Sequence, residues 1–296
     1  MEKLRLRNKI NLKNYTTIKV GGITEYFYEP TKVSEFIHLA NWAKSNSYDC
    51  RIIGAGSNLL IKNIYLKGLT ICTKKMKEIK INPNTGYLYA ECGVMLPMLS
   101  NLLAKNSCEG GEWMVGIPGT VGGALFMNAG CGNYTISKHL LSVQVINLKN
   151  QDIYEIKKED LSFKYRYSSF QENNLIILSA KFHFKPKGDL RSIMEKTKAN
   201  LKIRLASQPY HLPSFGSVFK NPCDNYAGKL IEETGLKGLK LGGAEISRMH
   251  ANFIVNTSSA TSDDILQLIT LVQQKVIQNK GILLDPEVRM IGFEYP

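Results

Sequence analysis

The sequence has no long apolar segment and no hydrophobic leader. None of its apolar runs approaches the roughly 18 residues that a membrane-spanning helix needs. The first residues, Met1-Glu2-Lys3-Leu4-Arg5, lack the apolar core of a signal peptide. We therefore expect a cytoplasmic protein that does not insert into a membrane.

Clustered cysteines are also missing. The six cysteines include no Cys-x-x-Cys pair, and they form no motif with the five histidines. This spacing disfavours a zinc site and a compact disulfide framework. We expect no bound metal, and we expect most of the cysteines to be buried free thiols in a reducing cytosol.

Acidic residues are few, since 25 Asp and Glu stand against 38 Lys and Arg and leave a net charge of +13. The basic residues are spread along the chain, which is typical of a solvated lysine-rich surface. The same excess also creates a positive field that attracts anionic ligands. A nucleic-acid-binding protein is a third alternative. Because the chain has no recognised nucleic-acid motif and no basic tract with interleaved aromatic residues, we expect no nucleic acid partner.

Hydrophobic periodicity predicts a mixture of helices and strands. Helices are expected at residues 32–46, 96–103, 189–207, 224–234 and 262–280. Strands are expected at residues 51–53, 58–61, 69–72, 87–92, 141–148, 151–156, 175–184 and 288–293. Thr261 suits the N-cap of the last helix, and Gly281 suits its end. The pattern predicts three parts, residues 1–72, 73–187 and 188–296, and the last strand can pack back on the first two.

Two glycine-rich segments stand out from this background. Residues 115–130 read Val-Gly-Ile-Pro-Gly-Thr-Val-Gly-Gly-Ala-Leu-Phe-Met-Asn-Ala-Gly, and residues 54–58 read Gly-Ala-Gly-Ser-Asn. A backbone with so few large side chains forms loops that approach a ligand closely and turn N–H groups toward phosphate oxygens. Tight turns in a β-rich domain are the alternative, above all for the shorter segment. Two such segments in one chain predict a long ligand with a central pyrophosphate.

Neither segment fits the common nucleotide-binding motifs. Gly54-x-Gly56 continues to Leu59 where the dinucleotide fingerprint needs a third glycine, and Lys74 and Lys75 stand where an acidic ribose ligand is expected. Gly228-Lys229 lacks the upstream glycine of a Walker A loop. A Rossmann fold and a P-loop are therefore both disfavoured.

The glycine segments belong to a series of motifs that resembles the UDP-N-acetylenolpyruvoylglucosamine reductase (MurB) family. The motifs lie in family order along nearly the whole chain, at residues 14–22, 54–60, 116–130, 163–170, 216–222, 242–253 and 285–289. The resemblance implies an α+β fold, in which a two-subdomain FAD-binding fold of the PCMH/VAO type is followed by a C-terminal α/β substrate-binding domain. The short stretch between residues 167 and 217 resembles the family branch that lacks an extra substrate-covering insertion. Cys131-Gly-Asn-Tyr134 departs from the family pattern at the edge of the flavin pocket.

The resemblance also implies the activity. Family members are flavin-dependent oxidoreductases that reduce UDP-N-acetylglucosamine enolpyruvate to UDP-N-acetylmuramate in peptidoglycan precursor synthesis, with FAD as cofactor and NADPH as hydride donor. Hydride arrival at C3 of the enolpyruvyl group leaves negative charge on C2 and the adjacent carboxylate, and C2 then needs a proton. An FAD oxidoreductase of the same fold with another small substrate is the nearest alternative.

Three residues match the catalytic positions of the family. Ser217 matches the acid that protonates C2, and Arg166 matches a bidentate ligand of the carboxylate. Glu287 acts as a donor only when protonated, so the resemblance implies a raised pKa for its carboxyl group. Without the resemblance, each residue has an ordinary structural alternative. Ser217 would be a turn residue, and Arg166 would be a solvated residue at a strand edge. Glu287 would be an exposed residue that forms an ion pair with Arg289.

Further residues match the binding positions of the family. Those expected to bind FAD are Gly54, Ala55, Gly56, Ser57, Asn58, Leu59, Gly116, Ile117, Pro118, Gly119, Thr120, Gly122, Gly123, Ala124 and Asn128. Those expected to bind the UDP-sugar are Arg204, Lys220, Asn221, His250 and Arg289.

Overall fold

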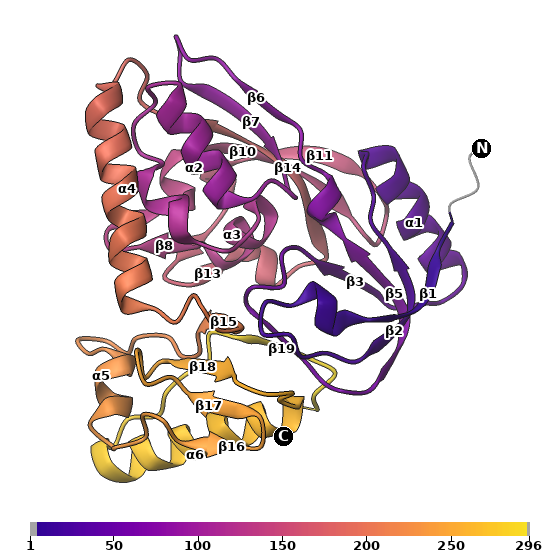
Figure 1. The fold of residues 1–296 in the computed structure, drawn as a ribbon. Coiled ribbons are helices and arrows are strands. Elements are labelled where there is room, and N and C mark those ends of the chain that lie inside the picture. The colour runs from indigo at the N-terminus through magenta and orange to yellow at the C-terminus, as the bar shows by residue number, and fades with distance from the viewer. Residues whose placement is uncertain (1–4, 295–296) are drawn as a thin grey trace. The chain divides into compact units, whose positions relative to one another are not determined.

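The chain divides into two compact units in a computed structural model that describes residues 5–294 (Figure 1). The first unit comprises the described part of Met1–Arg7 with Tyr26–Ala55 and Lys67–Arg204. The second comprises Asn8–Glu25, Gly56–Leu66 and the described part of Leu205–Pro296. The division into residues 1–72, 73–187 and 188–296 stays a prediction about functional parts.

An antiparallel sheet in the order β11-β10-β14-β7-β6 is the centre of the first unit. Its strands are β6 (Ile79–Ile81), β7 (Tyr87–Glu91), β10 (Leu140–Asn147), β11 (Ile153–Lys157) and β14 (Leu175–His183). The pairing of Val143 with Ala180, both buried, places apolar side chains of two central strands in the core. The strands predicted for this region are confirmed within one or two residues at each end.

Helices and shorter elements complete the first unit. The helices are α1 (Val33–Ser45), α2 (Leu96–Lys105), α3 (Val121–Met127) and α4 (Leu190–Ser207, whose last turn enters the second unit). Short strands are β3 (Cys50–Ile53), β8 (Gly130–Cys131), β9 (Tyr134–Thr135), β12 (Phe163–Lys164) and β13 (Tyr167–Ser168). Single 3-10 turns lie at Thr73–Lys75, Glu112–Gly116, Ile136–His139, Lys158–Asp160 and Ser169–Gln171.

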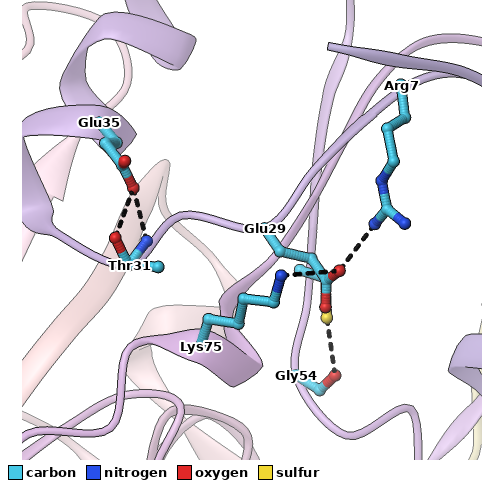
Figure 2. Close-up of polar contacts among 7 residues, drawn as sticks. Arg7, Glu29, Thr31, Glu35, Gly54 and Lys75 are labelled. Carbon is cyan, nitrogen blue, oxygen red and sulfur yellow. Dashed lines mark hydrogen bonds and ion pairs between the residues drawn. The ribbon is translucent and has the colours of Figure 1, made fainter. Parts of the chain in front are cut away.

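The first helix shows how local sequence sets an element boundary. Its apolar residues Phe36, Leu39, Ala40 and Ala43 recur at helical spacing and are buried, as the pattern predicts. Glu35 reaches back to the N-terminus of the helix, where its Oε2 accepts hydrogen bonds from Thr31 N at 2.6 Å and Thr31 Oγ1 at 3.1 Å (Figure 2). These bonds satisfy groups that a helix start leaves open.

An ion-pair cluster lies beside this helix start. Glu29 follows β2 (Ile23–Tyr28), and its Oε2 forms ion pairs with Arg7 at 2.7 Å and Lys75 at 3.6 Å (Figure 2). Because both cationic side chains are about half exposed, the cluster adds little stability. It ties the start of β1 (Arg7–Asn11) to the turn after β5 (Tyr65–Cys72) within the first unit.

A four-stranded antiparallel sheet, β15-β18-β17-β16, and two helices form most of the second unit. The elements are β15 (Ser214–Ser217), α5 (Ala227–Glu232), β16 (Lys240–Leu241), β17 (Ala244–Ile246), β18 (Phe253–Asn256) and α6 (Ser262–Lys280). Helix α6 packs on β16 and β17 through Ile265, Leu268 and Val272 (Figure 1). Thr261 Oγ1 accepts from Asp264 N, and Gly281 ends the helix with φ +68°, so both predicted ends are confirmed.

The N-terminal and C-terminal segments meet in this second unit. Strand β19 (Arg289–Ile291) pairs in parallel with β4 (Leu59–Ile61), which directly follows residues 54–58. Ile18, Val20 and Leu60 share a core with residues of the sheet and α6. Strands β1 (Arg7–Asn11), β2 (Ile23–Tyr28) and β5 (Tyr65–Cys72) run along the chain from one unit into the other, and a 3-10 turn spans Leu12–Tyr15.

The structure corrects the expected loop at residues 116–130 and the expected burial of the cysteines. Residues 116–130 are not a continuous loop, because α3 occupies their middle. All six cysteines are free as expected, but only Cys72, Cys92 and Cys108 are buried, whereas Cys131 and Cys223 are exposed. In the described residues no helix is both long and apolar enough to span a bilayer.

Candidate active site

The longer glycine-rich segment is a turn followed by a capped helix. Thr120 is the N-cap of α3, and its Oγ1 accepts a hydrogen bond from Gly123 N at 3.3 Å. A Cβ on Gly122 would lie 2.9 Å from Cys92 Cβ, so only glycine lets this helix pack on the end of β7. Helix formation here depends on packing and capping, because two consecutive glycines oppose it.

Gly54 touches the same cap residue. A Cβ on Gly54 would lie 2.5 Å from Thr120 Oγ1, and therefore a side chain at residue 54 displaces the hydroxyl that caps α3. The Gly54 carbonyl accepts a weak hydrogen bond from the Cys72 thiol, with sulfur and oxygen 3.7 Å apart (Figure 2). The glycine-rich segments at residues 54–55 and 116–130 thus meet within the first unit, where Gly54 lies directly against the Thr120 side chain.

Asn128 ends α3 and has an unused acceptor. Its backbone is left-handed, with φ +43°, and its Nδ2 donates to Lys164 O at 2.8 Å. The side-chain Oδ1 is buried and has no hydrogen-bond partner among the described residues. A buried unpaired acceptor is costly, so this atom calls for an N–H or O–H donor from a ligand.

The rest of the shorter segment lies in the second unit. Gly56 has φ +68°, and a Cβ there would lie 2.0 Å from Tyr15 O, so no other residue fits. The Asn58 side chain donates to Glu287 O at 3.0 Å. Within residues 5–294, the backbone N–H groups of residues 56–58 donate no hydrogen bond. They are free to bind an anion.

These residues fit FAD. Its diphosphate needs N–H donors, its hydroxyl and ring N–H groups need acceptors, and its length needs a backbone without bulky side chains. Each unit by itself offers some of these features. The first unit has the unpaired Asn128 Oδ1 and the glycines against Thr120 and Cys92, and the second unit has the open N–H groups of residues 56–58.

A cavity of about 480 Å³ lies in the second unit beside the sheet. It brings together three residues that the sequence proposes for the site, Ser217, Asn221 and His250. The other lining residues are Tyr226, Gly228, Lys229, Glu232, Glu233, Met249, Ala251 and Asn252. Sequence reasoning missed these, although Asn252 lies inside the His250-Ala-Asn-Phe253 motif.

Ser217 is held at the cavity by its neighbours. It ends β15 opposite Phe253, after Gly216 with φ +80°. Asn252 fixes the following residues, because its backbone O accepts from Val218 N at 2.9 Å and its side chain exchanges two hydrogen bonds with the Phe219 backbone. The Glu287 N–H donates to Val218 O at 2.7 Å, which brings the chain at residue 287 beside residue 218.

His250 presents a defined tautomer. Its Nδ1 accepts a hydrogen bond from Asn252 N at 3.2 Å, so the ring proton of the neutral form lies on Nε2. Burial, reinforced by the charge of Lys237, lowers the pKa of His250. The ring packs on Phe253 with centroids 4.9 Å apart, and Gly228 leaves room for it. His250 is therefore a neutral donor at the cavity near pH 7.

Other proposed residues are held by different contacts. Lys220 forms an ion pair with Asp285 at 2.6 Å, and Asn221 Oδ1 accepts from Ala227 N at the start of α5. Arg289 N donates to Asn58 O at 3.0 Å. Lys220, Glu287 and Arg289 are not among the described residues that line the cavity, and Arg204 lies on α4 in the first unit.

Arg166 occupies a turn. It is the second of two residues between β12 and β13 and has φ +53°, a conformation that favours glycine or asparagine. Its guanidinium lies 5.0 Å from the centre of the Tyr165 ring. Arg166 thus lies in a hairpin turn and is half-buried. The catalytic and binding roles of all these residues stay predictions.

Comparisons with known proteins identify two domains along the chain. Residues 24–156 match the FAD binding domain, and residues 208–291 match the UDP-N-acetylenolpyruvoylglucosamine reductase C-terminal domain. A UDP-N-acetylenolpyruvoylglucosamine reductase of Prochlorococcus marinus subsp. pastoris is 63% identical over 100% of both chains. One from a Synechococcus species is 44% identical over 98% of this chain and 94% of its own.

A solved structure shows the same fold. The UDP-N-acetylenolpyruvylglucosamine reductase (MurB) of Thermus caldophilus superposes with a TM-score of 0.82 at 30% identity, over 98% of this chain and 100% of its own. The fold is thus α+β, with an FAD-binding domain followed by a MurB C-terminal domain. On identity along its whole length, this chain belongs to the UDP-N-acetylenolpyruvoylglucosamine reductase family, a family of FAD-dependent oxidoreductases.

Proposed function

We propose that this protein reduces UDP-N-acetylglucosamine enolpyruvate to UDP-N-acetylmuramate for peptidoglycan precursor synthesis, with NADPH as hydride donor. Family membership and the names of its relatives support the reaction. The carrying observation is the cavity that joins a hydroxyl, an amide and a neutral imidazole from Ser217, Asn221 and His250. A cytoplasmic location, and the branch without the substrate-covering insertion, stay predictions.

FAD is proposed to bind residues 54–59 and 116–124, with the open N–H groups of residues 56–58 at its diphosphate and Asn128 Oδ1 as an acceptor. When bound, FAD supplies hydride transfer from NADPH to C3 of the enolpyruvyl group. The glycines of this chain leave the path of the ligand free of side chains. The N–H groups of residues 56–58 are the open donors, and Asn128 Oδ1 is the unpaired acceptor.

The proposed catalytic residues handle charge and proton on the substrate. Arg166 grips the enolpyruvyl carboxylate, where negative charge accumulates, with its planar pair of N–H donors. Ser217 gives its hydroxyl proton to C2, and Glu287, when protonated, donates a hydrogen bond to the same charge. Arg204, Lys220, Asn221, His250 and Arg289 are proposed to bind the UDP-sugar. For Lys220 this requires exchange of Asp285 for the ligand.

The two half-reactions test the assignment separately. Ser217→Ala should leave flavin bleaching by NADPH intact and slow flavin reoxidation by UDP-N-acetylglucosamine enolpyruvate by about 10²- to 10⁴-fold, the usual contribution of a general acid. Ser214→Ala, three residues earlier on the same strand, is the matched control. Stopped-flow absorbance of the flavin measures both rates.

Equal slowing of both half-reactions by Ser217→Ala would refute the role of Ser217 as the acid. Absence of reoxidation by this substrate in the native protein, with reoxidation by another small molecule, would refute the proposed substrate. NADH in place of NADPH is the comparison that tests the donor.

A further inference from the structure

The hairpin that carries Arg166 is tied to the end of helix α3. Hairpin β12–β13 has only two paired positions, Phe163 with Ser168 and Lys164 with Tyr167, which is too little to hold a turn by itself. Arg166 also has the left-handed backbone that a bulky residue disfavours. Contacts outside the hairpin must therefore hold it.

Side chains from both partners make these contacts. The Asn128 amide donates to Lys164 O at 2.8 Å, and Ser168 Oγ donates to Phe126 O at 2.7 Å. Gln171 follows the hairpin on a 3-10 turn, and its Nε2 donates to both Phe126 O at 2.9 Å and Arg166 O at 3.2 Å. A side-chain amide nitrogen has two N–H groups, so it serves both carbonyls at once.

Gln171 is the one residue of this set that reaches Arg166 itself. Phe126 lies in the last turn of α3, where carbonyl groups lack partners in the helix, and Gln171 uses one of them as a fixed point. Its other N–H then fixes the carbonyl of Arg166. The helix that begins at the Thr120 cap and the arginine are thereby linked within the first unit by one amide group.

We propose that Gln171 is a positioning residue that sets the place of the Arg166 guanidinium for the substrate carboxylate. This rests on the proposed function, in which Arg166 grips that carboxylate. Gln171 touches neither substrate nor cofactor in this role. It acts by keeping a disfavoured turn conformation populated, and small displacements of a positioned group are costly to a reaction rate.

The test replaces the donor and keeps the size. Gln171→Glu places an ionised acceptor against two carbonyl oxygens, so the tether is lost. We expect flavin reoxidation by the UDP-sugar substrate to slow about 10- to 100-fold, while flavin reduction by NADPH is unchanged. Gln171→Lys restores donors and should recover most of the rate. Gln273→Glu is the matched control, because Gln273 Nε2 donates to Leu284 O at 2.9 Å in the second unit.

A double-mutant cycle separates positioning from general damage. In an Arg166→Ala background, Gln171→Glu should add almost nothing to the loss, because the group it positions is gone. Hydrogen exchange of the amides at residues 163–168 should rise in Gln171→Glu and stay unchanged in Gln273→Glu. Should Gln171→Glu fail to accumulate as folded protein, Gln171→Met removes the same donors without charge.

Slow reoxidation in Arg166→Ala together with native rates in Gln171→Glu would overturn the positioning role alone. Native reoxidation in Arg166→Ala would overturn the proposed role of Arg166, and Gln171 would lose its function with it. Additive losses in the double mutant would show that Gln171 acts by another route and would also overturn the inference.

Discussion

Gly54→Ala tests the close contact between the two glycine-rich segments. Gly54 has no left-handed backbone in the structure, so alanine meets no backbone strain. Its methyl group would lie 2.5 Å from Thr120 Oγ1, well inside the roughly 3.5 Å of a relaxed contact. The Thr120 hydroxyl must move, and its bond to Gly123 N is then lost.

The magnitude follows from these two effects. Loss of an N-cap hydroxyl costs about 1 kcal/mol, and overpacking of a tight contact costs about 1–3 kcal/mol. Thr120→Ala alone should lower the free energy of unfolding by about 1 kcal/mol. In that background the obstacle is gone, so Gly54→Ala should cost almost nothing. Gly54→Ala alone carries both costs, so the coupling between the two changes should be about 2–4 kcal/mol.

Urea unfolding of flavin-free protein, followed by tryptophan fluorescence, measures this coupling. The chain has two tryptophans, Trp42 and Trp113, and both lie in the first unit with residues 54 and 120. Gly123→Ala is the control, because its Cβ would lie 3.6 Å from the same hydroxyl, an ordinary contact. The coupling would be refuted if Gly54→Ala lowered the free energy of unfolding equally in the presence and absence of the Thr120 hydroxyl.

Two further predictions concern titratable groups. Burial lowers the pKa of His250 from 6.5, so the unfolded chain takes up a proton first as pH falls. The contribution of neutral His250 to the free energy of unfolding is therefore complete above pH 6.5 and is lost as pH falls through the folded pKa. Urea midpoints of the native protein should fall toward those of His250→Gln between pH 7 and 5, and a constant difference would contradict this. Burial raises the pKa of the Cys50 and Cys92 thiols to about 12, so at pH 8 a disulfide reagent should label the exposed Cys131 and Cys223 first. Rapid labelling of Cys92, read by mass spectrometry of peptides, would show that the β7 end is open.

Helix boundaries were predictable where local signals agreed. The apolar spacing of residues 33–43 and the cap pair of Thr261 and Asp264 depend only on neighbours in sequence, and both helices form as expected. Helix α3 was missed because its glycines argue for a loop. It forms because Gly122 packs on Cys92 and Thr120 caps its start, and the first of these contacts is long-range.

Some residues of the candidate site were likewise predictable from the sequence, and others were not. The motifs around Ser217, Asn221 and His250 indicated a shared role, and one cavity joins them. The local sequence did not point to Gln171, and it placed Asn252 inside a motif without indicating its role. Each works through hydrogen bonds to a residue more than 30 positions away. Their value depends on chain segments that only folding brings into contact.

The sequence by itself determined the glycine segments, the helix caps and the order of motifs, because each is a property of adjacent residues. Only the tertiary structure decided the left-handed turn at Arg166 and the pairing of β19 with β4. These depend on which carbonyl or N–H from a distant segment meets each group, and a buried polar group accepts only an arrangement in which its partner is present.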